Sequence, residues 1–240
     1  MICPKCGNSQ TDVRADCSKC GIYFFKYERA QQRKLLAQSE PVAVGMLWQM
    51  SEAANPLYRV GRGLLLLGIA WLSWQLIFSP VDYWQGNAAS RSFLHNVNLP
   101  FHEAGHLFFS PLGSFMQSLG GTLGQLLMPM VCCLVLLLKT RDAFGAAVAF
   151  WWFAENFLDS VSYINDASKL NMPLLGGNEG SSSPYGFHDW EFILTEMGLV
   201  NQAQNIASVT HNAGSLLMLL ALLWMLLLLL RPAQSSVPYK

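Results

Sequence analysis

Apolar residues gather in long runs that predict membrane-crossing helices. Residues 60–78 are mostly Leu, Ile, Ala and Trp, and a helix of that length, at about 1.5 Å per residue, crosses a hydrocarbon core of about 30 Å. Further apolar stretches cover residues 101–119, 123–138, 143–164 and 212–230. The pattern therefore predicts an all-α polytopic membrane protein with about four to five membrane segments, in a transmembrane domain over residues 60–231.

The stretch 101–119 differs from the others because polar residues interrupt it. His102, Glu103 and His106 lie among its apolar residues, and two glycines follow it. Such a sequence makes a poor lipid-facing helix, whereas irregular backbone at membrane depth is tolerated where protein or a wet cavity shields it. We therefore expect four full spans and, at 101–119, one broken or re-entrant segment.

Basic residues indicate the orientation of these segments, because cytoplasmic loops are enriched in Lys and Arg. Those that precede or begin the first span are Lys26, Arg29, Arg33, Lys34, Arg59 and Arg62. If the segment 101–119 enters and returns on one side, Lys139 and Arg141 join them in the cytoplasm and the loop 165–205 lies outside. We expect a multipass protein of the inner cell membrane with a cytoplasmic N-terminus.

Composition supports a lipid environment and excludes one class of partner. Hydrophobic residues make up 52% of the chain and charged residues only 12%, whereas a soluble protein carries about 25% charged residues. The formal net charge is +0, so no overall positive field attracts nucleic acid, and we expect none as a partner. Residues 1–10 lack the basic and apolar regions of a cleaved signal peptide.

Two copies of the unit Cys-x-x-Cys-Gly stand near the N-terminus. Their thiols belong to Cys3, Cys6, Cys17 and Cys20. Four sulfurs at about 2.3 Å form a tetrahedral zinc site, which leaves no open coordination position for catalysis. A pair of redox sites is the alternative, but no βαβ pattern surrounds either unit. We expect a knuckle around one structural zinc that supplies most of its folding free energy.

The knuckle, residues 1–28, resembles the short zinc-ribbon modules found at the start of many bacterial membrane proteins. Its expected role is to bind a cytoplasmic protein partner or to steady the N-terminal tail. A charged linker over residues 29–59 follows it, and residues 232–240 form a C-terminal tail.

The segment 101–119 holds a second candidate metal site. His102 and His106 lie at positions i and i+4, so a helix presents both imidazoles on one face. Glu103 is then placed as the general base that takes a proton from zinc-bound water. The alternative is a pair of hydrogen-bonded histidines in the core of a bundle. Because ionisable groups at membrane depth are costly and mark functional sites, we expect a catalytic zinc here.

The motif His-Glu-x-Gly-His, followed by a Gly-rich turn and by the string Gly-Gln-Leu-Leu-Met-Pro at residues 124–129, resembles the site-2-protease clan of intramembrane zinc metalloproteases. The resemblance covers roughly residues 95–195. It implies peptide-bond hydrolysis in or near the bilayer, and a third zinc ligand that is an Asp on a later membrane helix, usually in a Leu-Asp-Gly motif. That motif is missing, and Leu158-Asp159-Ser160 is the nearest string.

Depth in the membrane ranks the candidates for the third ligand, since all ligands must reach one metal. Asp166 emerges on the same side as His102 in the re-entrant arrangement, and we rank it first. His188, in the following loop, meets the depth requirement and ranks second. Asp159 lies about 10 Å deeper along the helix than Asp166 and ranks third. Asp189 is expected to orient a ligating imidazole from outside.

Several of these polar residues also have roles that need no metal. A helix C-terminal position accounts for Asp166, and the N-cap of a helix over residues 190–197 accounts for Asp189. Glu155 and Asn156 either line a wet cavity or form hydrogen bonds between helices, and we favour the second interpretation.

The sequence therefore favours a zinc metalloprotease that holds one catalytic and one structural zinc and acts on a membrane-protein or peptide substrate. The alternative, from another class, is a non-catalytic membrane adaptor whose knuckle recruits a cytoplasmic partner. The two differ at Glu103, because a protease loses cleavage in Glu103→Gln while it retains zinc. An adaptor keeps its cellular role in the same variant.

Overall fold

The computed structural model describes residues 2–10, 15–29, 31, 45–50, 55–80 and 86–231 of the chain. They belong to two compact units, Met1–Trp48 and Gln49–Lys240. The predicted tail 232–240 and most of the predicted linker 29–59 lie outside the described residues. In the part of the chain that is described, regular structure is helical and extended segments form only isolated bridges. This confirms the all-α prediction.

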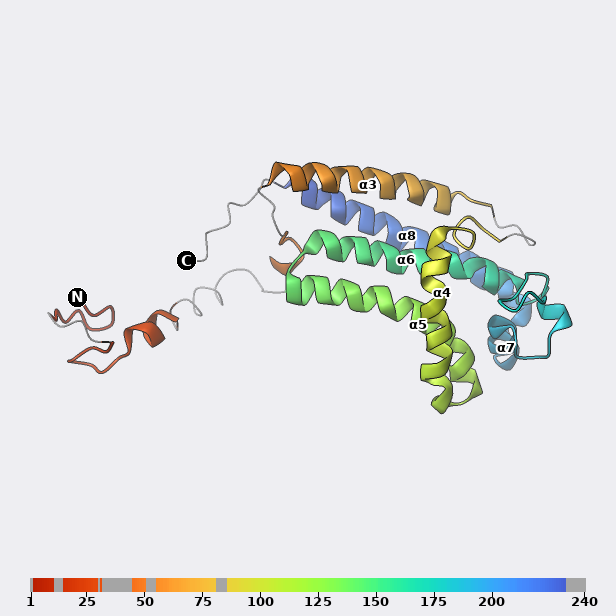
Figure 1. The fold of residues 1–240 in the computed structure, drawn as a ribbon, viewed down its shortest axis with the longest axis horizontal. Helices are drawn as coiled ribbons and strands as arrows, with labels where there is room; N and C mark the ends of the chain where they lie inside the picture. The colour runs from red at the N-terminus through yellow and green to blue at the C-terminus, as the bar shows by residue number, and fades with distance from the viewer. Residues whose placement is uncertain are drawn as a thin grey trace. The chain divides into compact units, whose positions relative to one another are not determined.

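The second unit is a bundle of long helices (Figure 1). Its long helices are α3 (Pro56–Ile77), α5 (Ser114–Val135), α6 (Ala143–Asp166) and α8 (Ala203–Leu230). Local sequence explains where α3 begins, because the Asn55 side chain accepts a hydrogen bond from the N–H of Leu57 and Pro56 occupies the first turn. A short π-helical segment, Leu136–Thr140, ends α5.

The predicted broken segment is a helical hairpin. Helix α4 (Phe93–Phe109) begins after Ser92, whose side chain caps it, and a 3-10 turn (Ser110–Leu112) follows it. The chain then reverses at Gly113, where φ is 95° and glycine is favoured, and enters α5. In Figure 1, α4 runs across the bundle rather than along it. The expected break is confirmed, while the course of this hairpin through a membrane stays a prediction.

Glycines allow α4 and α5 to approach each other closely. A Cβ atom at Gly105 would clash with the carbonyl oxygen of Gly120, and one at Gly124 would clash with the carbonyl oxygen of Phe101. Small residues at helix interfaces are the common route to such contact in membranes, where apolar burial offers little drive for association. The glycines therefore fix the distance between the helix that carries the histidines and the helix behind it.

Helix α6 carries the core of the bundle. It packs chiefly against α8 and also against α5, and most of its residues are buried. Many of its buried residues are alanines: Ala143, Ala146, Ala147, Ala149 and Ala154. Cys133 of α5 packs with two of them, which agrees with a small apolar residue in a span.

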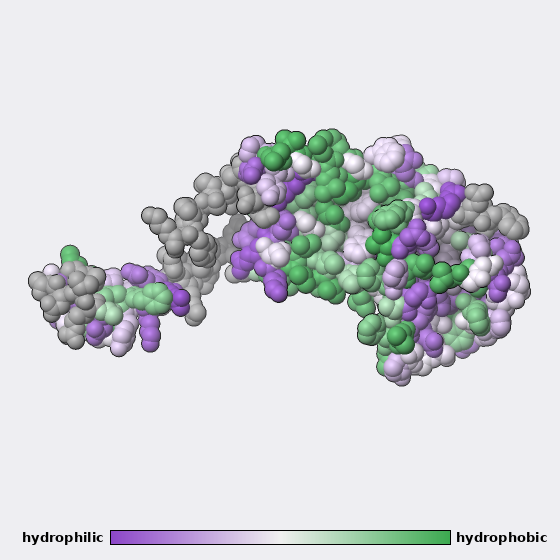
Figure 2. Space-filling view, in the orientation of Figure 1, coloured by the Kyte–Doolittle hydropathy of each residue, from purple (hydrophilic) through white to green (hydrophobic). Residues whose placement is uncertain are grey.

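Within the described residues, three helical segments are long and apolar enough to cross a membrane: Pro56–Ile77, Ser114–Thr140 and Val200–Leu230. Figure 2 shows hydrophobic residues over much of the length of the bundle and hydrophilic ones gathered toward its ends. Helix α6 has similar length but carries Glu155, Asp159 and Asp166. Its crossing, expected as a fourth span, stays a prediction.

Basic residues collect at one end of the bundle. Arg59, at the start of α3, donates to a carbonyl oxygen near the end of α8 at 2.7 Å. Arg62 lies 3.6 Å from Asp142, which precedes α6. The starts of α3 and α6 and the end of α8 therefore share one end, and the loop 167–188 lies at the other end of α6 (Figure 1). The expected orientation depends on this arrangement.

Candidate metal centre

The N-terminal unit brings its cysteines together. The group whose sulfur atoms all lie within 4.8 Å of one another is Cys3, Cys6, Cys17 and Cys20. Each turn closes on a glycine with positive φ, 69° at Gly7 and 66° at Gly21, which explains the glycine after each second cysteine. Within the cluster a hydrogen bond with the backbone of Cys20 is the main cause that lowers the pKa of the Cys17 thiol, whereas the pKa of Cys20 is raised by desolvation and by the neighbouring thiols. The cluster is compatible with the expected zinc knuckle.

The second candidate site begins on α4. His102 and His106 lie one turn apart with ring centroids separated by 4.8 Å, as their spacing predicted. The Nδ1 atom of His102 lies 2.9 Å from Gln125 Oε1, and the Nδ1 atom of His106 lies 2.8 Å from the backbone oxygen of Gln117. A carbonyl oxygen can only accept a hydrogen bond, so each Nδ1 carries the proton and donates it. In the neutral ring the Nε2 atom is then left with a free lone pair.

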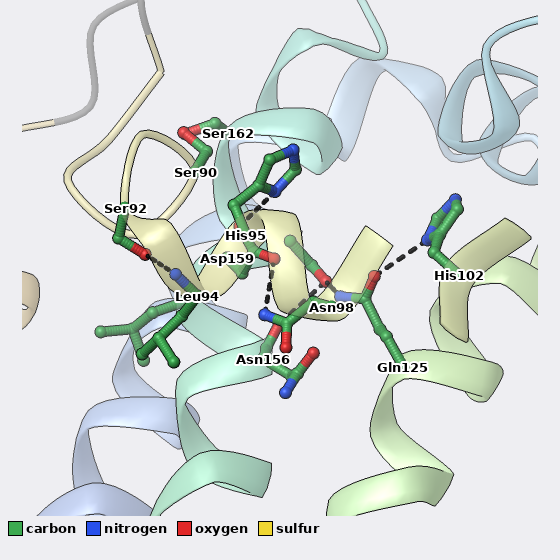
Figure 3. A network of polar contacts seen from close by, with 12 residues as sticks. Ser90, Ser92, Leu94, His95, Asn98, His102, Gln125, Asn156, Asp159 and Ser162 are labelled. Atoms are coloured by element: carbon green, nitrogen blue, oxygen red, sulfur yellow. Dashed lines mark hydrogen bonds and ion pairs between the residues drawn. The ribbon is translucent and has the colours of Figure 1, made fainter. Parts of the chain in front are cut away.

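Gln125 is itself held in one orientation, which makes its role as acceptor firm. Ser160 donates its hydroxyl proton to the backbone oxygen of Asn156 at 2.9 Å. The Ser160 oxygen can therefore only accept from Gln125, whose Nε2 lies 3.0 Å away. The carbonyl oxygen of Gln125 then faces His102, as Figure 3 shows. Such a partner fixes both the tautomer and the ring orientation of a metal-binding histidine.

Helix α7 (Asp189–Glu196) brings a carboxylate to the two rings. Asp189 Oδ2 lies 3.2 Å from His102 Nε2 and 3.4 Å from His106 Nε2. Burial alone would raise the pKa of the Asp189 carboxyl, but the two imidazoles beside it, when they are protonated, outweigh burial and hold the pKa below its usual value. Two imidazole lone pairs and a carboxylate oxygen thus face one another, and they need a shared cation between them, either a proton or a metal ion.

The space beside these groups depends on one glycine. A Cβ atom at Gly121 of α5 would lie 2.5 Å from His102 Nε2 and 2.6 Å from His106 Cε1. Both distances are far below ordinary van der Waals contact, so any side chain at this position would displace the imidazoles. Gly121 therefore provides the room in which the two Nε2 atoms meet Asp189.

Asp166, ranked first from the sequence as the third ligand, lies elsewhere. Its carboxylate accepts hydrogen bonds from the backbone N–H groups of Asn171 and Met172, both at 3.0 Å. The ranking used depth alone: Asp166 ends α6 at the expected level, but its side chain turns to the loop that leaves the helix, and a role as ligand finds no support in this position. The residue that joins the histidines is Asp189, which the sequence argument had placed outside the ligands.

His188, the second-ranked candidate, also points away from the metal site. It is the N-cap of α7, where its Nδ1 accepts from the N–H of Glu191 at 3.1 Å, and its Nε2 lies 3.4 Å from Asp166 Oδ2. The predicted N-cap, Asp189, is instead the first residue of the helix. The cap is displaced by one residue, and this difference frees the Asp189 carboxylate for the histidines.

Asp159, the third-ranked candidate, belongs to a separate polar cluster between α4 and α6. His95 Nδ1 lies 2.9 Å from its Oδ1. Asn98 donates through one nitrogen to Asp159 Oδ2 and to Glu155 Oε2, both at 3.0 Å (Figure 3). These contacts agree with the interpretation of Glu155 as a source of hydrogen bonds between helices.

A cavity of about 1000 Å³ opens beside the histidine pair. Glu103, His102, His106 and Asp189 all line it, together with Tyr163 of α6. The Glu103 side chain is exposed. The Tyr163 hydroxyl accepts a hydrogen bond from the N–H of Asp189 at 3.0 Å and lies 3.4 Å from its Oδ2. Apolar residues of the loop after α6 add to the lining: Met172, Leu174, Leu175 and Phe187.

The arrangement is a metal-binding donor set of two imidazoles and one carboxylate, with a second carboxylate, that of Glu103, on the wall of the same cavity. The sequence indicated Asp189 only as a residue that orients a ligating imidazole or caps a helix. Comparison with known proteins found no protein-family model, no curated protein and no solved structure that matches the chain.

Proposed function

We propose that the chain is a membrane-embedded zinc metalloprotease that hydrolyses peptide bonds in or near the bilayer. The observation that carries the proposal is the convergence of His102, His106 and Asp189 within 4.8 Å of one another, next to Glu103 on one cavity. Two histidines and a carboxylate, with one coordination position open, are a common donor set of catalytic zinc sites.

Each residue has a role that follows from its position. His102, His106 and Asp189 hold the metal, and their three groups leave the fourth position for water. A zinc ion held there would lower the pKa of a bound water and polarise the scissile carbonyl. Glu103 takes a proton from the water and returns it to the leaving amine. Tyr163 lines the same cavity and holds Asp189, since its hydroxyl accepts from the Asp189 N–H and faces the Asp189 carboxylate.

The cavity suits an extended peptide segment. Its walls combine the polar site with apolar side chains from the loop after α6, and the unit that contains it has helices long and apolar enough to cross a membrane. These features support a membrane-protein or peptide substrate whose scissile bond lies close to the membrane surface. The arrangement of basic residues at one end of the bundle supports an inner-membrane protein with its N-terminus in the cytoplasm.

A second candidate function rests on the N-terminal unit. Its four cysteines form a closed donor set, and the unit is separate from the helical one, which supports a role in binding a cytoplasmic protein. A non-catalytic adaptor would need only this unit and a membrane anchor. An adaptor would not need Glu103 and the two histidines together on the wall of one cavity. For that reason we favour the protease.

Zinc counts and cleavage by purified protein in detergent test the proposal. We expect two zinc ions in the wild type, one in His102→Ala, one in Cys3→Ala, and two in Glu103→Gln. A mixture of quenched fluorescent peptides reports cleavage, which Glu103→Gln should reduce by at least about 100-fold, the scale of general-base catalysis. His211→Ala, on α8 away from the cavity lining, is the matched control for loss of a histidine.

Two results would contradict the proposal. Wild-type protein that holds one zinc, lost in Cys3→Ala, would leave the helical unit without a metal. If Glu103→Gln still cleaves the peptides, another residue or a contaminating protease is responsible for the cleavage.

A further inference from the structure

Asp189 reaches the histidines from the first residue of a short helix. Helix α7 has 8 residues, so contacts at its N-terminus decide where Asp189 points. Two residues beside that N-terminus are among the most buried polar groups of the chain, His188 with 0% and Asp166 with 1% of their surface exposed. Neither belongs to the cluster that could hold the metal.

Asp166 joins three parts of the structure through one carboxylate. The residue ends α6. Its two oxygens accept from the backbone N–H groups of Asn171 and Met172, at 3.0 Å each, and Met172 begins the part of the loop that lines the cavity. Oδ2 also lies 3.4 Å from His188 Nε2. Movement of this carboxylate would therefore affect both the cavity wall and the start of α7.

His188 uses both ring nitrogens toward fixed partners. Its Nδ1 accepts from the N–H of Glu191, so the proton of the neutral ring is on Nε2. That nitrogen has no hydrogen bond of good geometry within the described part of the chain, and the Asp166 carboxylate faces it at 3.4 Å. A buried N–H facing a buried carboxylate is stabilising, whereas either group alone would be costly.

Tyr163 connects His188 to the metal-binding carboxylate. The two rings lie against each other, with centroids 4.2 Å apart. The phenol oxygen accepts from the N–H of Asp189 and lies 3.4 Å from its Oδ2. The position of the Asp189 side chain is thus tied to α6 twice, through Tyr163 directly and through His188 and Asp166.

We propose that Asp166 and His188 form a buried clasp that positions Asp189 as the third metal ligand and holds the adjoining cavity wall. The inference rests on the proposed function, because a positioned ligand requires a metal site. Both residues are positioning residues, since neither touches the metal-binding atoms. The clasp gives a role to Asp166 and His188, the two residues that their expected depth in the membrane had favoured as metal ligands.

A merely structural role makes a different prediction. If His188 only caps α7 and Asp166 only ends α6, their loss lowers the melting temperature but leaves zinc affinity unchanged in the protein that remains folded. His188→Asn separates the two roles. Asn is a strong N-cap residue, so it keeps the acceptor for Glu191, but it is too short to reach Asp166.

The test compares full-length His188→Asn, Asp166→Ala and their double variant with wild type. Competition with a chromophoric chelator gives the zinc affinity of the second site, the absorption spectrum of the cobalt-substituted protein reports its ligand geometry, and helical circular dichroism gives the melting temperature. We expect each single variant to bind zinc about 10- to 100-fold more weakly, the range for residues that orient metal ligands. The double variant should be no weaker than the more affected single one, because both break one contact.

His211→Ala is the control and should bind as wild type. If Asp166→Ala does not fold, Asp166→Asn replaces it, since the amide oxygen can still accept from one of the two loop N–H groups but offers no charge to His188. Wild-type affinity and an unchanged cobalt spectrum in His188→Asn would overturn the clasp while the metal site stands. A wild-type protein with no zinc beyond that of the knuckle would overturn the proposed function, and the clasp with it.

Discussion

Gln125 determines which nitrogen of His102 faces the cavity. Its side-chain oxygen receives the Nδ1 proton, and its amide nitrogen is committed to Ser160. An apolar side chain of similar length would leave the His102 ring free to rotate and to change tautomer. If the proposed metal binds there, Gln125 contributes to its affinity without touching it.

Replacement of Gln125 tests this role. We expect Gln125→Leu to weaken zinc binding at the second site by about 10- to 100-fold, whereas Gln125→Glu, which keeps an acceptor at the same place, should retain most of the affinity. Gln117→Leu is the matched control, because His106 uses the backbone oxygen of Gln117 and not its side chain. Zinc titration of the purified variants makes the measurement. Equal affinity in Gln125→Leu and wild type would remove Gln125 from the site.

At this scale the sequence predicted part of the candidate site. The spacing of His102 and His106 was sufficient to place them on one face, because helix geometry alone determines that relation. The third residue begins a short helix after a long loop, and spacing along the sequence gives no direction for it. Depth favoured Asp166, but hydrogen bonds to two backbone N–H groups turned its side chain away.

Contact between α4 and α5 depends on the absence of side chains. Gly105 lies against the backbone of Gly120, and a methyl group there would meet a carbonyl oxygen that cannot move without its helix. Since α5 also supplies Gln125 and Gly121, a small separation of the two helices would remove a hydrogen bond from His102. Helix spacing and metal geometry are therefore coupled.

Gly105→Ala measures this coupling. We expect the melting temperature to fall, with a loss of about 1–3 kcal/mol in the free energy of unfolding as for other overpacked cores, and the second zinc to bind more weakly. Gly68→Ala is the control on α3, since a Cβ there meets nothing within 4 Å. Melting curves followed by circular dichroism test the expected loss of stability, and zinc counts on the same samples test the expected weaker binding. A stable Gly105→Ala with two zinc ions would show that the hairpin can absorb a methyl group.

At the scale of helices, the periodicity and length of the apolar runs predicted more of the structure than the sequence did at the scale of single residues. The apolar runs 60–78, 123–138 and 212–230 correspond to segments long and apolar enough to cross a membrane, because span length follows from bilayer thickness. The break in the run 101–119 followed from its polar residues. The reversal at Gly113 and the transverse direction of α4 could not be predicted, since they depend on packing against α5.

The helical unit as a whole places Arg59 and Arg62 and its candidate site toward different ends of the bundle. Arg59 and Arg62 lie where α3 begins and α8 ends. The loop 167–188, which leads to Asp189, leaves the opposite end of α6. If the basic end is cytoplasmic, the metal site opens toward the external face of the membrane.

Labelling of single cysteines checks this orientation. Ser182 is exposed in the loop, and we expect Ser182→Cys to react with an impermeant thiol reagent in intact cells. Lys139→Cys, in the exposed turn after α5, is the matched control and should react only after the membrane is permeabilised. The reverse pattern would place the loop inside, and the re-entrant topology would have to be abandoned.

The distance along the chain between the histidines and Asp189 has a consequence for biogenesis. The interval between His106 and Asp189 is 83 residues (189 − 106 = 83), which a ribosome adding about 5–20 residues per second needs roughly 4 to 17 s to complete. During that time the chain holds the two imidazoles and Glu103 without Asp189. If the proposed function holds, a nascent chain therefore has an incomplete centre, and hydrolysis can begin only once the segment that contains Asp189 has been made.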